Sequence, residues 1–191
     1  MRVFLAVLVL FFSFQSWTKA DDISEFEIEG MAIGDSALNY FSEEVIKKNK
    51  KDWFKDNKYS VSADLKPSFL KNYDALQIAY ITKDKKYKIE GIEAIKFYQY
   101  NIDDCYSSFE KIASEIQEVF TNALVSTKDK VKHPYDKTGK STVTDQYFSF
   151  SNNDAIVLAC EDWGKETGFT DGMRISVRKS EYRSFLHNAF N

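Results

Sequence analysis

Alternation of apolar and polar residues constrains the fold of this chain more than any other feature of its sequence. Segments that alternate with a period of two, and that are rich in Ile, Val, Tyr, Phe and Thr, form half-buried β-strands. Six segments have this pattern: Tyr59–Leu65, Ala75–Thr82, Tyr87–Tyr100, Thr142–Phe150, Ala155–Asp162 and Met173–Lys179. Short polar turns separate several of them, which favours antiparallel pairing. We therefore expect a mainly antiparallel sheet.

Two further segments have the periodicity of amphipathic helices. Asp103 or Asp104 can cap the first, in which apolar residues recur every three or four positions: Cys105, Phe109, Ile112, Ile116, Val119 or Phe120, and Ala123. Ser180 can cap the second, whose inward residues are predicted to be Tyr182, Phe185, Leu186, Ala189 and Phe190. The expected fold is an α+β domain with its helices packed on one face of the sheet.

The segments between these elements give three more predictions. Phe26–Glu29 alternates and predicts a strand, after which glycines break the pattern. Two short helices are expected next, the first capped by Asp35 or Ser36 and the second starting at Ser42. Ser126–Lys140 is polar and turn-like, so we expect a mobile loop there.

An internal repeat is one interpretation of this element order, because three strands followed by a helix occur twice. Asp74–Tyr80 resembles Asp154–Cys160, and Glu90–Ile92 resembles Asp171–Met173. The second segment starts 16 residues after the first in one half of the chain and 17 residues after it in the other. These likenesses suggest a repeated hairpin. The alternative is that strands of one fold class share composition without being repeats.

The N-terminus has the three parts of a secretory signal. A positive start at Arg2 precedes the apolar stretch Val3–Phe14, and small residues lead to a predicted cleavage after Ala20. The apolar stretch is about 12 residues, whereas a membrane span needs roughly 20. We expect residues 1–20 to be a signal peptide and residues 21–191 one globular domain without a membrane span, located in the periplasm or outside the cell.

Charge argues against a nucleic-acid partner. Residues 1–20 contain two basic and no acidic side chains, so the mature chain would carry 24 basic and 29 acidic residues. Lysines are spread along the chain, as on a solvated surface. Only four residues are arginine, and three of them, Arg174, Arg178 and Arg183, crowd the last segment.

Two cysteines, Cys105 and Cys160, are the only ones in the chain. In an exported protein such a pair is expected to form a disulfide bond. Cys160 shares a strand face with Ile156 and Leu158, and Cys105 lies on the apolar stripe of the long helix, so both thiols should point into the same interface. No Cys-x-x-Cys motif suggests a redox role.

Other chemistry finds little support in the sequence. His133 and His187 have no second histidine at metal-binding spacing, and we predict no metal, cofactor or catalytic residue set. Carboxylate pairs occur at Asp21–Asp22, Asp103–Asp104 and Glu161–Asp162, as expected for an acidic surface. Asp103–Asp104 suits a helix N-terminus, and Glu161–Asp162 closes a strand as a surface feature.

One motif suggests catalysis. Ile33–Leu38, with Gly34, Asp35 and Ser36, resembles the Gly-Asp-Ser opening of the GDSL family of esterases and lipases. The resemblance implies that Ser36 is a nucleophile in a turn that also holds an oxyanion. The chain departs from that family at Ser151–Asp154, which lacks the Gly of a Gly-x-Asn-Asp block, and at Ser184–His187, which lacks the Asp of Asp-x-x-His. A capping role for Ser36 needs only local residues.

A second resemblance covers more of the chain. The run Phe26–Ser42, the body rich in Lys, Tyr and Phe and the two-cysteine pattern are similar to uncharacterised exported proteins of Pelagibacter-like marine alphaproteobacteria. This resemblance implies an envelope location and a Gram-negative source. It implies no activity.

These observations favour a binding or interaction module over an enzyme, because no set of nucleophile, base and orienting group can be assembled. Trp53–Phe54 and Trp163 are the candidates for an exposed contact surface. The expected partner is a protein, a peptide or an envelope component. The alternative is a GDSL-like esterase that uses Ser36.

Overall fold

In the computed structural model, which describes residues 22–99 and 101–190, the chain folds around one antiparallel sheet. The predicted signal peptide, residues 1–20, lies outside the described residues. The strands are β1 (Lys50–Lys51), β2 (Tyr59–Leu65), β3 (Ala75–Ile81), β4 (Ile89–Phe97), β5 (Leu124–Val125), β6 (Asp129–Lys132), β7 (Thr142–Ser149), β8 (Ala155–Asp162) and β9 (Gly172–Arg178). The helices are α1 (Glu43–Lys48), α2 (Ile102–Val119) and α3 (Ser180–Phe190), with short 3-10 turns η1 (Ile23–Glu25), η2 (Ala37–Asn39) and η3 (Lys165–Thr167).

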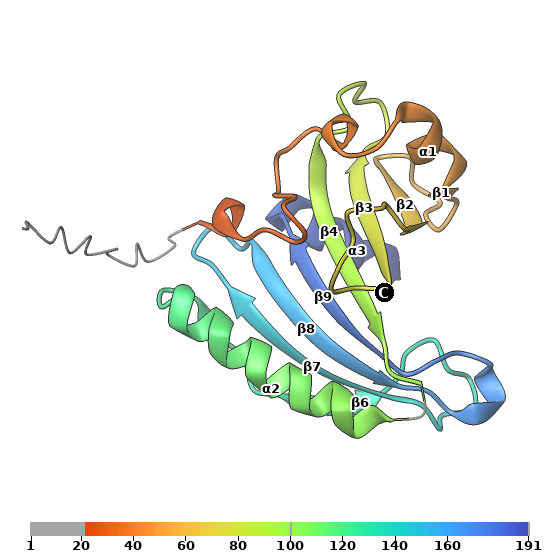
Figure 1. Cartoon of the computed structure of the whole chain (residues 1–191), viewed down its shortest axis with the longest axis vertical. Helices are drawn as coiled ribbons and strands as arrows, with labels where there is room; N and C mark the ends of the chain where they lie inside the picture. Colours follow the sequence, from red (N-terminus) through yellow and green to blue (C-terminus); the bar gives the residue numbers. More distant parts are fainter. Residues whose placement is uncertain (1–21, 100, 191) are drawn as a thin grey trace, which may run out of the picture.

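The predicted α+β class with a mainly antiparallel sheet is confirmed (Figure 1). The strand order is β1-β2-β3-β4-β9-β8-β7-β5, and β6 also pairs with β7. β2 and β8 have the predicted bounds, and the other four predicted strands begin or end within three residues of expectation. Two triplets, β2-β3-β4 and β7-β8-β9, thus meet at the antiparallel pair of β4 and β9.

Because side chains alternate along each strand, the sheet has two faces that differ in chemistry. The face that we call the disulfide face is apolar and carries Ile78, Ile92, Leu158, Cys160 and Ile175. The opposite face, which we call the arginine face, carries Glu93, Glu161, Arg174, Ser176 and Arg178 on its central strands. The first holds the main core, and the second holds the candidate site.

Helix α2 covers β8 and β9 on the disulfide face. Its buried residues are Cys105, Phe109, Ala113 and Ile116, and Phe120 at its C-terminal cap is buried as well. The predicted stripe is therefore right in its main positions but shifted in phase at two. Ile112 is only partly buried and Val119 is 40% exposed, because Ala113 and Phe120 face the sheet in their place.

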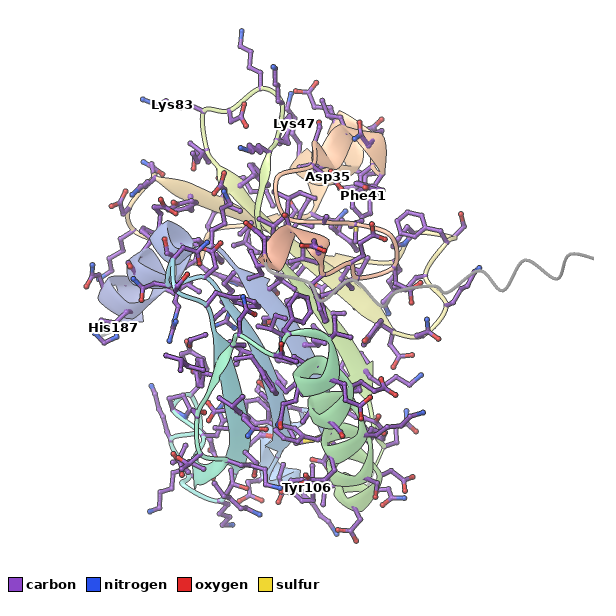
Figure 2. The ribbon with its side chains drawn as sticks, turned by 90° about the vertical axis from the view of Figure 1, so that its left-hand side faces the viewer. Asp35, Phe41, Lys47, Lys83, Tyr106 and His187 are labelled. Carbon is purple, nitrogen blue, oxygen red and sulfur yellow. A yellow bond between two sulfur atoms is a disulfide. The ribbon has the colours of Figure 1, made fainter. Side chains whose placement is uncertain are left out.

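The N-terminal segment, residues 23–48, covers the other half of the disulfide face. Ser62 Oγ donates a hydrogen bond to the Ile46 carbonyl (2.7 Å), and the Gly34 amide donates to the Ile89 carbonyl (2.9 Å). The two short helices were predicted correctly, and Ser36 and Ser42 are their N-cap residues. This segment lies on the same side of the sheet as α2 (Figures 1 and 2).

The strand predicted at Phe26–Glu29 is wrong. Residues in this stretch form a tight turn closed by a single bridge between Ile28 and Met31. Glu29 and Gly30 both have positive φ angles, 52° and 78°, so the chain reverses direction before a strand can extend. Alternation alone cannot distinguish a strand from such a turn.

Helix α3 packs on the arginine face, which corrects the prediction that all helices share one face of the sheet. Tyr182 and Phe185 of α3 are buried against Tyr59 and Val61 of β2, and Figure 2 shows α2 and α3 on opposite sides of the sheet. The place over β2, β3 and β4 on the disulfide face is already occupied by residues 23–48. A second helix therefore has room only on the other side.

The two triplets resemble each other in one specific detail. Asp74 precedes β3 and its carboxylate accepts a hydrogen bond from the Phe97 amide (2.8 Å), two residues beyond the partner of Ala75. Asp154 precedes β8 and accepts from the Ser180 amide (2.7 Å), two residues beyond the partner of Ala155. This equivalence supports the repeat interpretation. The proposed match of Gly91 with Gly172 fails, because the register places Gly91 and Arg174 at like positions.

Two other expectations need correction. The segment Ser126–Lys140, expected to be a mobile loop, contains β6, which pairs with β7 from Asp129 to Lys132 although all four of its residues are exposed. Helix α2 begins earlier than predicted, with Asn101 as its N-cap and no side-chain capping bond. Asp103 and Asp104 lie in its first turn, where negative charge is favoured by the helix dipole.

Candidate functional site

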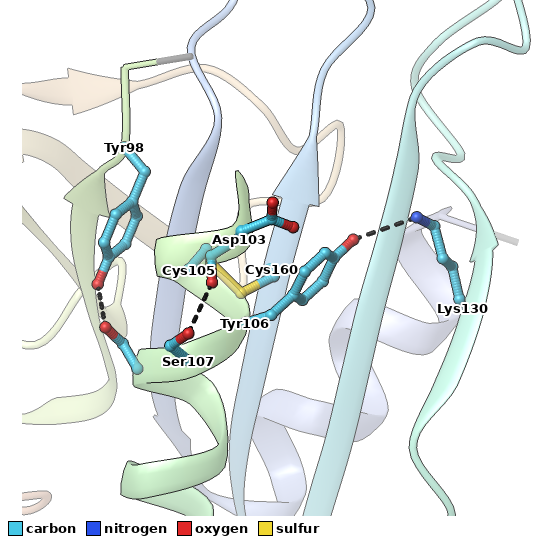
Figure 3. Close-up of a disulfide and its surroundings, with 8 residues drawn as sticks. Tyr98, Asp103, Cys105, Tyr106, Ser107, Lys130 and Cys160 are labelled. Carbon is cyan, nitrogen blue, oxygen red and sulfur yellow. Dashed lines mark hydrogen bonds between the residues drawn. A yellow bond between two sulfur atoms is a disulfide. The ribbon is translucent and has the colours of Figure 1, made fainter. Parts of the chain in front are cut away.

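The predicted disulfide bond is present and joins α2 to β8 (Figure 3). The Cα atoms of Cys105 and Cys160 lie 6.1 Å apart, and both side chains are fully buried. Their burial between helix and sheet agrees with the strand parity and the helix phase of the sequence. The bridge is part of the core, so these residues do not form a site.

Ser36 caps η2, as one of the two sequence interpretations predicted. Its Oγ accepts a hydrogen bond from the Leu38 amide (3.3 Å) and donates one to the Lys86 carbonyl (2.6 Å) in the turn between β3 and β4. The neighbouring Asp35 carboxylate accepts from the Tyr40 hydroxyl (2.6 Å), and burial together with Asp35 raises the pKa of Tyr40 to about 12. Both polar side chains of the Gly-Asp-Ser motif thus have structural partners.

The carboxylates and histidines form no metal site among residues 22–99 and 101–190, where no group of three or more potential ligands converges. Asp162 lies 3.6 Å from Lys130 in a surface ion pair. The surface position that the sequence predicted for Glu161 is wrong. Its side chain is only 14% exposed and points into an ion-pair network on the arginine face.

That network centres on Arg174 of β9. The Arg174 Nη1 lies 2.5 Å from Glu93 Oε1, and its Nε lies 2.8 Å from Glu161 Oε1. Ser176 Oγ donates to the other oxygen of Glu93 (2.7 Å), and Arg178 Nη2 lies 3.4 Å from that same oxygen. Arg174, Ser176 and Arg178 occupy alternate positions of β9. They contact Glu93 on the neighbouring strand β4, and Arg174 also contacts Glu161 on the other neighbour, β8.

Electrostatics keep this network charged. Burial alone would raise the pKa of Glu93, but Arg174, Arg178 and the Ser176 hydroxyl hold that pKa below its ordinary value. Burial would likewise lower the pKa of Arg174, yet Glu93 and Glu161 hold it above its ordinary value. Glu93 and Arg174 are therefore ionised together at neutral pH and fix one another in position.

An aromatic cluster, which we call the aromatic end, borders the network at Glu161. It comprises His133, Tyr135, Trp163 and Phe169. The His133 ring centre lies 3.9 Å from that of Trp163, and the indole Nε1 of Trp163 donates to Glu161 Oε2 (3.3 Å). His133 is buried, but Tyr135 and Phe169 are 63% and 66% exposed. This end therefore presents ring surface to solvent.

A second group, which we call the arginine end, lies at the opposite end of β9. It comprises Tyr147, Arg178 and Arg183. The guanidinium carbon of Arg183 lies 5.5 Å from the centre of the Tyr147 ring, and Arg178 also acts on the Tyr147 hydroxyl electrostatically. Glu161 pairs with Gly172, six residues before Arg178 on β9, yet Tyr135 of the aromatic end still interacts electrostatically with Arg178.

We call the network and its two ends together the arginine–aromatic surface. Sequence reasoning identified Trp163 and noted the three crowded arginines, but it missed His133 and Glu161 as members. The alternation of Arg174, Ser176 and Arg178 with apolar residues marks one polar face of β9 and could have indicated it. Of the predicted pair Trp53–Phe54, Trp53 is 50% exposed, whereas Phe54 packs edge-on against Phe185 (4.8 Å).

Two grooves lie elsewhere. One of about 420 Å³ runs between α1 and residues 64–69 and is lined mainly by aromatic and aliphatic side chains, including Phe41, Leu65 and Phe69. The other, about 200 Å³, lies between α2, Lys128 and the strand β7. Neither groove brings a hydroxyl group next to a histidine. We therefore place the candidate site on the arginine face.

Comparison of the chain with models of known protein families, with curated proteins and with solved structures found no match in any of the three. Within the described part of the chain, no helix has the length and apolar character of a membrane span. The candidate site therefore has to be interpreted from its own chemistry.

Proposed function

We propose that this chain is an exported protein of the bacterial envelope, that its mature part is a non-catalytic binding module, and that its ligand contacts the arginine–aromatic surface. A single observation carries the proposal. Lysine outnumbers arginine 22 to 4 in this chain, yet the three arginines of the described residues gather on one side of the sheet, beside exposed aromatic rings. Arg174 and Arg178 lie on β9, and Arg183 lies on α3, which packs on the same side. Arginine is the side chain suited to planar, bidentate recognition of a ligand.

The buried part of this surface supports the proposal further. Glu93 is 8% exposed and holds Arg174 and Arg178 from beneath, so the guanidinium groups are oriented before any ligand arrives. Side chains ordered in advance lose less entropy on binding than free ones. Exposed Tyr135 and Phe169 add apolar area next to these donors.

The envelope location rests on separate observations. Residues 1–20 have the composition of a secretory signal, and the disulfide between Cys105 and Cys160 suits an oxidising compartment. The esterase alternative has less support, because both partners of the Ser36 hydroxyl are backbone groups and no observation places a general base beside it.

Differential capture from an envelope extract tests the proposed site. The processed protein would be immobilised in three forms: wild type, the triple variant Tyr135→Ser/Phe169→Ser/Arg183→Gln, and the control variant Trp53→Ser/Leu124→Ser/Lys111→Gln. The control removes similar apolar area and charge from exposed positions elsewhere. We expect wild type and control to retain the same components and the surface variant to lose them. Identical capture by all three forms would refute the proposed site.

A further inference from the structure

Lysine side chains gather at one end of the molecule, which we call the lysine tip and define as residues 42–58 and 82–88. Two hydrogen bonds join these segments, from the Thr82 amide to the Lys58 carbonyl (3.1 Å) and from the Tyr87 hydroxyl to Glu43 Oε1 (2.9 Å). In Figure 1 both segments lie at the upper end, around α1 and the turn between β3 and β4. Figure 2 shows Lys47 and Lys83 together at this end. The fold thus brings together lysines that are spread along the sequence.

Charge is therefore distributed unevenly over the molecule. The lysine tip contains ten lysines and five acidic residues, whereas the rest of the chain after residue 20 contains 14 basic and 24 acidic residues. Charged residues that border the tip are Asp35, Asp64, Lys66, Lys179, Glu181 and Glu90. When they are included, this end still has twelve lysines against nine acidic residues. A positive end on an acidic protein is suited to an anionic partner.

The turn between β3 and β4 is the most basic part of the tip. Lys83, Lys85, Lys86 and Lys88 are all exposed there, and none forms an ion pair with a residue that the structure describes. The one acidic residue of the turn, Asp84, accepts hydrogen bonds from the backbone amides of Lys86 and Lys88, both at 2.9 Å. These bonds hold the Asp84 carboxylate within the turn. The four ammonium groups are thus left to contacts outside the molecule.

Two exposed apolar side chains flank this turn. Ile81 directly precedes it, and Leu38 lies in η2 on its other side. The Ser36 hydroxyl at the start of η2 donates to the Lys86 carbonyl (2.6 Å), and the Ala37 amide donates to the Tyr87 carbonyl (3.0 Å). The tip therefore combines free positive charge with exposed aliphatic surface, the combination by which proteins bind at a membrane surface.

From this arrangement we infer that the lysine tip docks the protein on an anionic lipid surface. The inference is independent of the ligand proposed for the arginine–aromatic surface. Strand β4 leads from the lysine turn at Ile89 to Phe97, which pairs with Gly172 beside the loop of residues 163–171. Docking through the tip would therefore direct that loop, with Trp163 and Phe169, away from the membrane.

A lipid surface fits the tip better than a small ligand or an acidic protein does. No lysine of the tip lines either groove described above, so neither groove provides an enclosed site for these charges. Lysine is a flexible, strongly hydrated point charge, which suits diffuse attraction more than the bidentate recognition typical of arginine. A specific protein partner would need a complementary surface of about 800 Å². Lipid headgroups instead rearrange around a projecting turn, and basic clusters bind anionic lipids without a fixed site.

Sedimentation of the processed protein with lipid vesicles tests the inference. Vesicles of equal parts phosphatidylglycerol and phosphatidylcholine supply the anionic surface, and vesicles of phosphatidylcholine alone supply the neutral one. We expect at least about tenfold tighter binding to the anionic vesicles, and weaker binding as salt screens the charges. Each lysine at such a surface contributes about fivefold in affinity, so Lys83→Gln/Lys85→Gln/Lys86→Gln should weaken binding at least about tenfold.

Two further variants serve as controls. Lys111→Gln/Lys137→Gln/Lys165→Gln changes the net charge of the protein by the same amount at exposed positions outside the tip. It should change binding less than about twofold, because charges farther from the membrane than the Debye length are screened. Lys83→Arg/Lys85→Arg/Lys86→Arg keeps the charge of the turn and should bind as wild type does. Thermal unfolding of all variants should match wild type, which excludes misfolding as a cause.

Several outcomes would overturn the inference. Equal binding to the neutral vesicles would show that charge does not direct the contact, and equal weakening by the two glutamine variants would show that only the overall charge matters. Absence of binding to the anionic vesicles would also reject it. Soluble polyglutamate that removes the protein from the vesicles at equal charge concentration would indicate an acidic protein partner instead. None of these outcomes affects the proposal for the arginine–aromatic surface, which envelope capture tests separately.

Discussion

Tyr182 of α3 rests directly on the backbone of Gly91 in β4. A Cβ atom at Gly91 would lie 2.7 Å from two carbons of the Tyr182 ring, closer than such atoms can approach. The ring cannot move aside easily, because it packs against Tyr59, with ring centres 5.1 Å apart, and is only 6% exposed. The missing side chain of Gly91 is therefore what lets α3 approach the arginine face.

Gly91→Ala should destabilise the protein by about 1–3 kcal/mol, as overpacking of a well-packed core does. Urea unfolding of wild type, Gly91→Ala, Tyr182→Leu and the double variant would measure the coupling. Because the smaller Leu relieves the contact, the double variant should lose less stability than the sum of the single losses. Additive losses would mean that the two residues do not oppose each other.

Much of this arrangement could be predicted from the sequence, but not all of it. A glycine within a long strand, as at Gly91, is typical of a bulge or a close approach. Both are present here, since Tyr182 packs on Gly91 and the register with β3 shifts between Ala79 and Tyr80. The side of the sheet that α3 covers could not be predicted, because it depends on the space taken by residues 23–48. Local periodicity specifies which side of a helix is buried, but not which sheet face receives it.

The candidate site shows the same limit. Strand parity places Arg174, Ser176 and Arg178 together, because they lie two residues apart on one strand. Glu93 and Glu161 join them only through pairing of β4 and β8 with β9, and that register is set by the whole sheet. His133 directly follows the strand β6, whose pairing with β7 brings it to the site. The sequence did not predict β6, because all four of its residues are exposed and its pattern does not alternate between buried and exposed positions.

Truncation of two core residues should separate the observed helix phase from the predicted one. Leu158→Ala should cost about 2–5 kcal/mol, because Leu158 is fully buried on the disulfide face. The apolar stripe predicted from the sequence includes Ile112, so the predicted helix phase implies a similar cost for Ile112→Ala. Since Ile112 is only partly buried, its truncation should now cost clearly less than that of Leu158. Denaturant unfolding would measure both losses of stability, provided that the dependence of unfolding free energy on denaturant concentration is unchanged. Equal losses in the two variants would contradict the observed helix phase of α2.

The disulfide bond should contribute substantially to stability. It links positions 55 residues apart, and a loop of that length corresponds to roughly 4 kcal/mol on chain-entropy estimates. We expect the double variant Cys105→Ala/Cys160→Ala to unfold at much lower denaturant concentration than wild type. Intact mass after alkylation without reduction supplies the control. Labelling of both cysteines before reduction would show that the bond is absent in the protein.

Acid should weaken the ion-pair network through Glu93. The folded-state pKa of Glu93 lies below its ordinary value. The contribution of its carboxylate to the free energy of unfolding is therefore present above about pH 4.3 and is lost as pH falls through the folded-state pKa. At neutral pH, Glu93→Gln should cost about 3 kcal/mol, because it leaves two partly buried guanidinium groups without their carboxylate. The difference in free energy of unfolding between wild type and Glu93→Gln should become smaller as pH falls into the acidic range. A difference that is independent of pH would show that charge at Glu93 does not stabilise the fold.

Ser36→Ala distinguishes the capping role of Ser36 from the esterase alternative. The hydroxyl bonds the Leu38 amide and the Lys86 carbonyl, so its loss should cost about 0.5–2 kcal/mol of stability and leave no activity to lose. A nucleophile behaves differently, since its replacement abolishes ester hydrolysis and can stabilise the fold. Short-chain p-nitrophenyl esters would be assayed with wild type and Ser36→Ala, and Ser42→Ala, which removes the cap of α1, would serve as the matched control. Hydrolysis by wild type and Ser42→Ala that disappears in Ser36→Ala would refute the binding-module proposal. Equal stability losses in both variants without hydrolysis would support it, because both serines would then act only as caps.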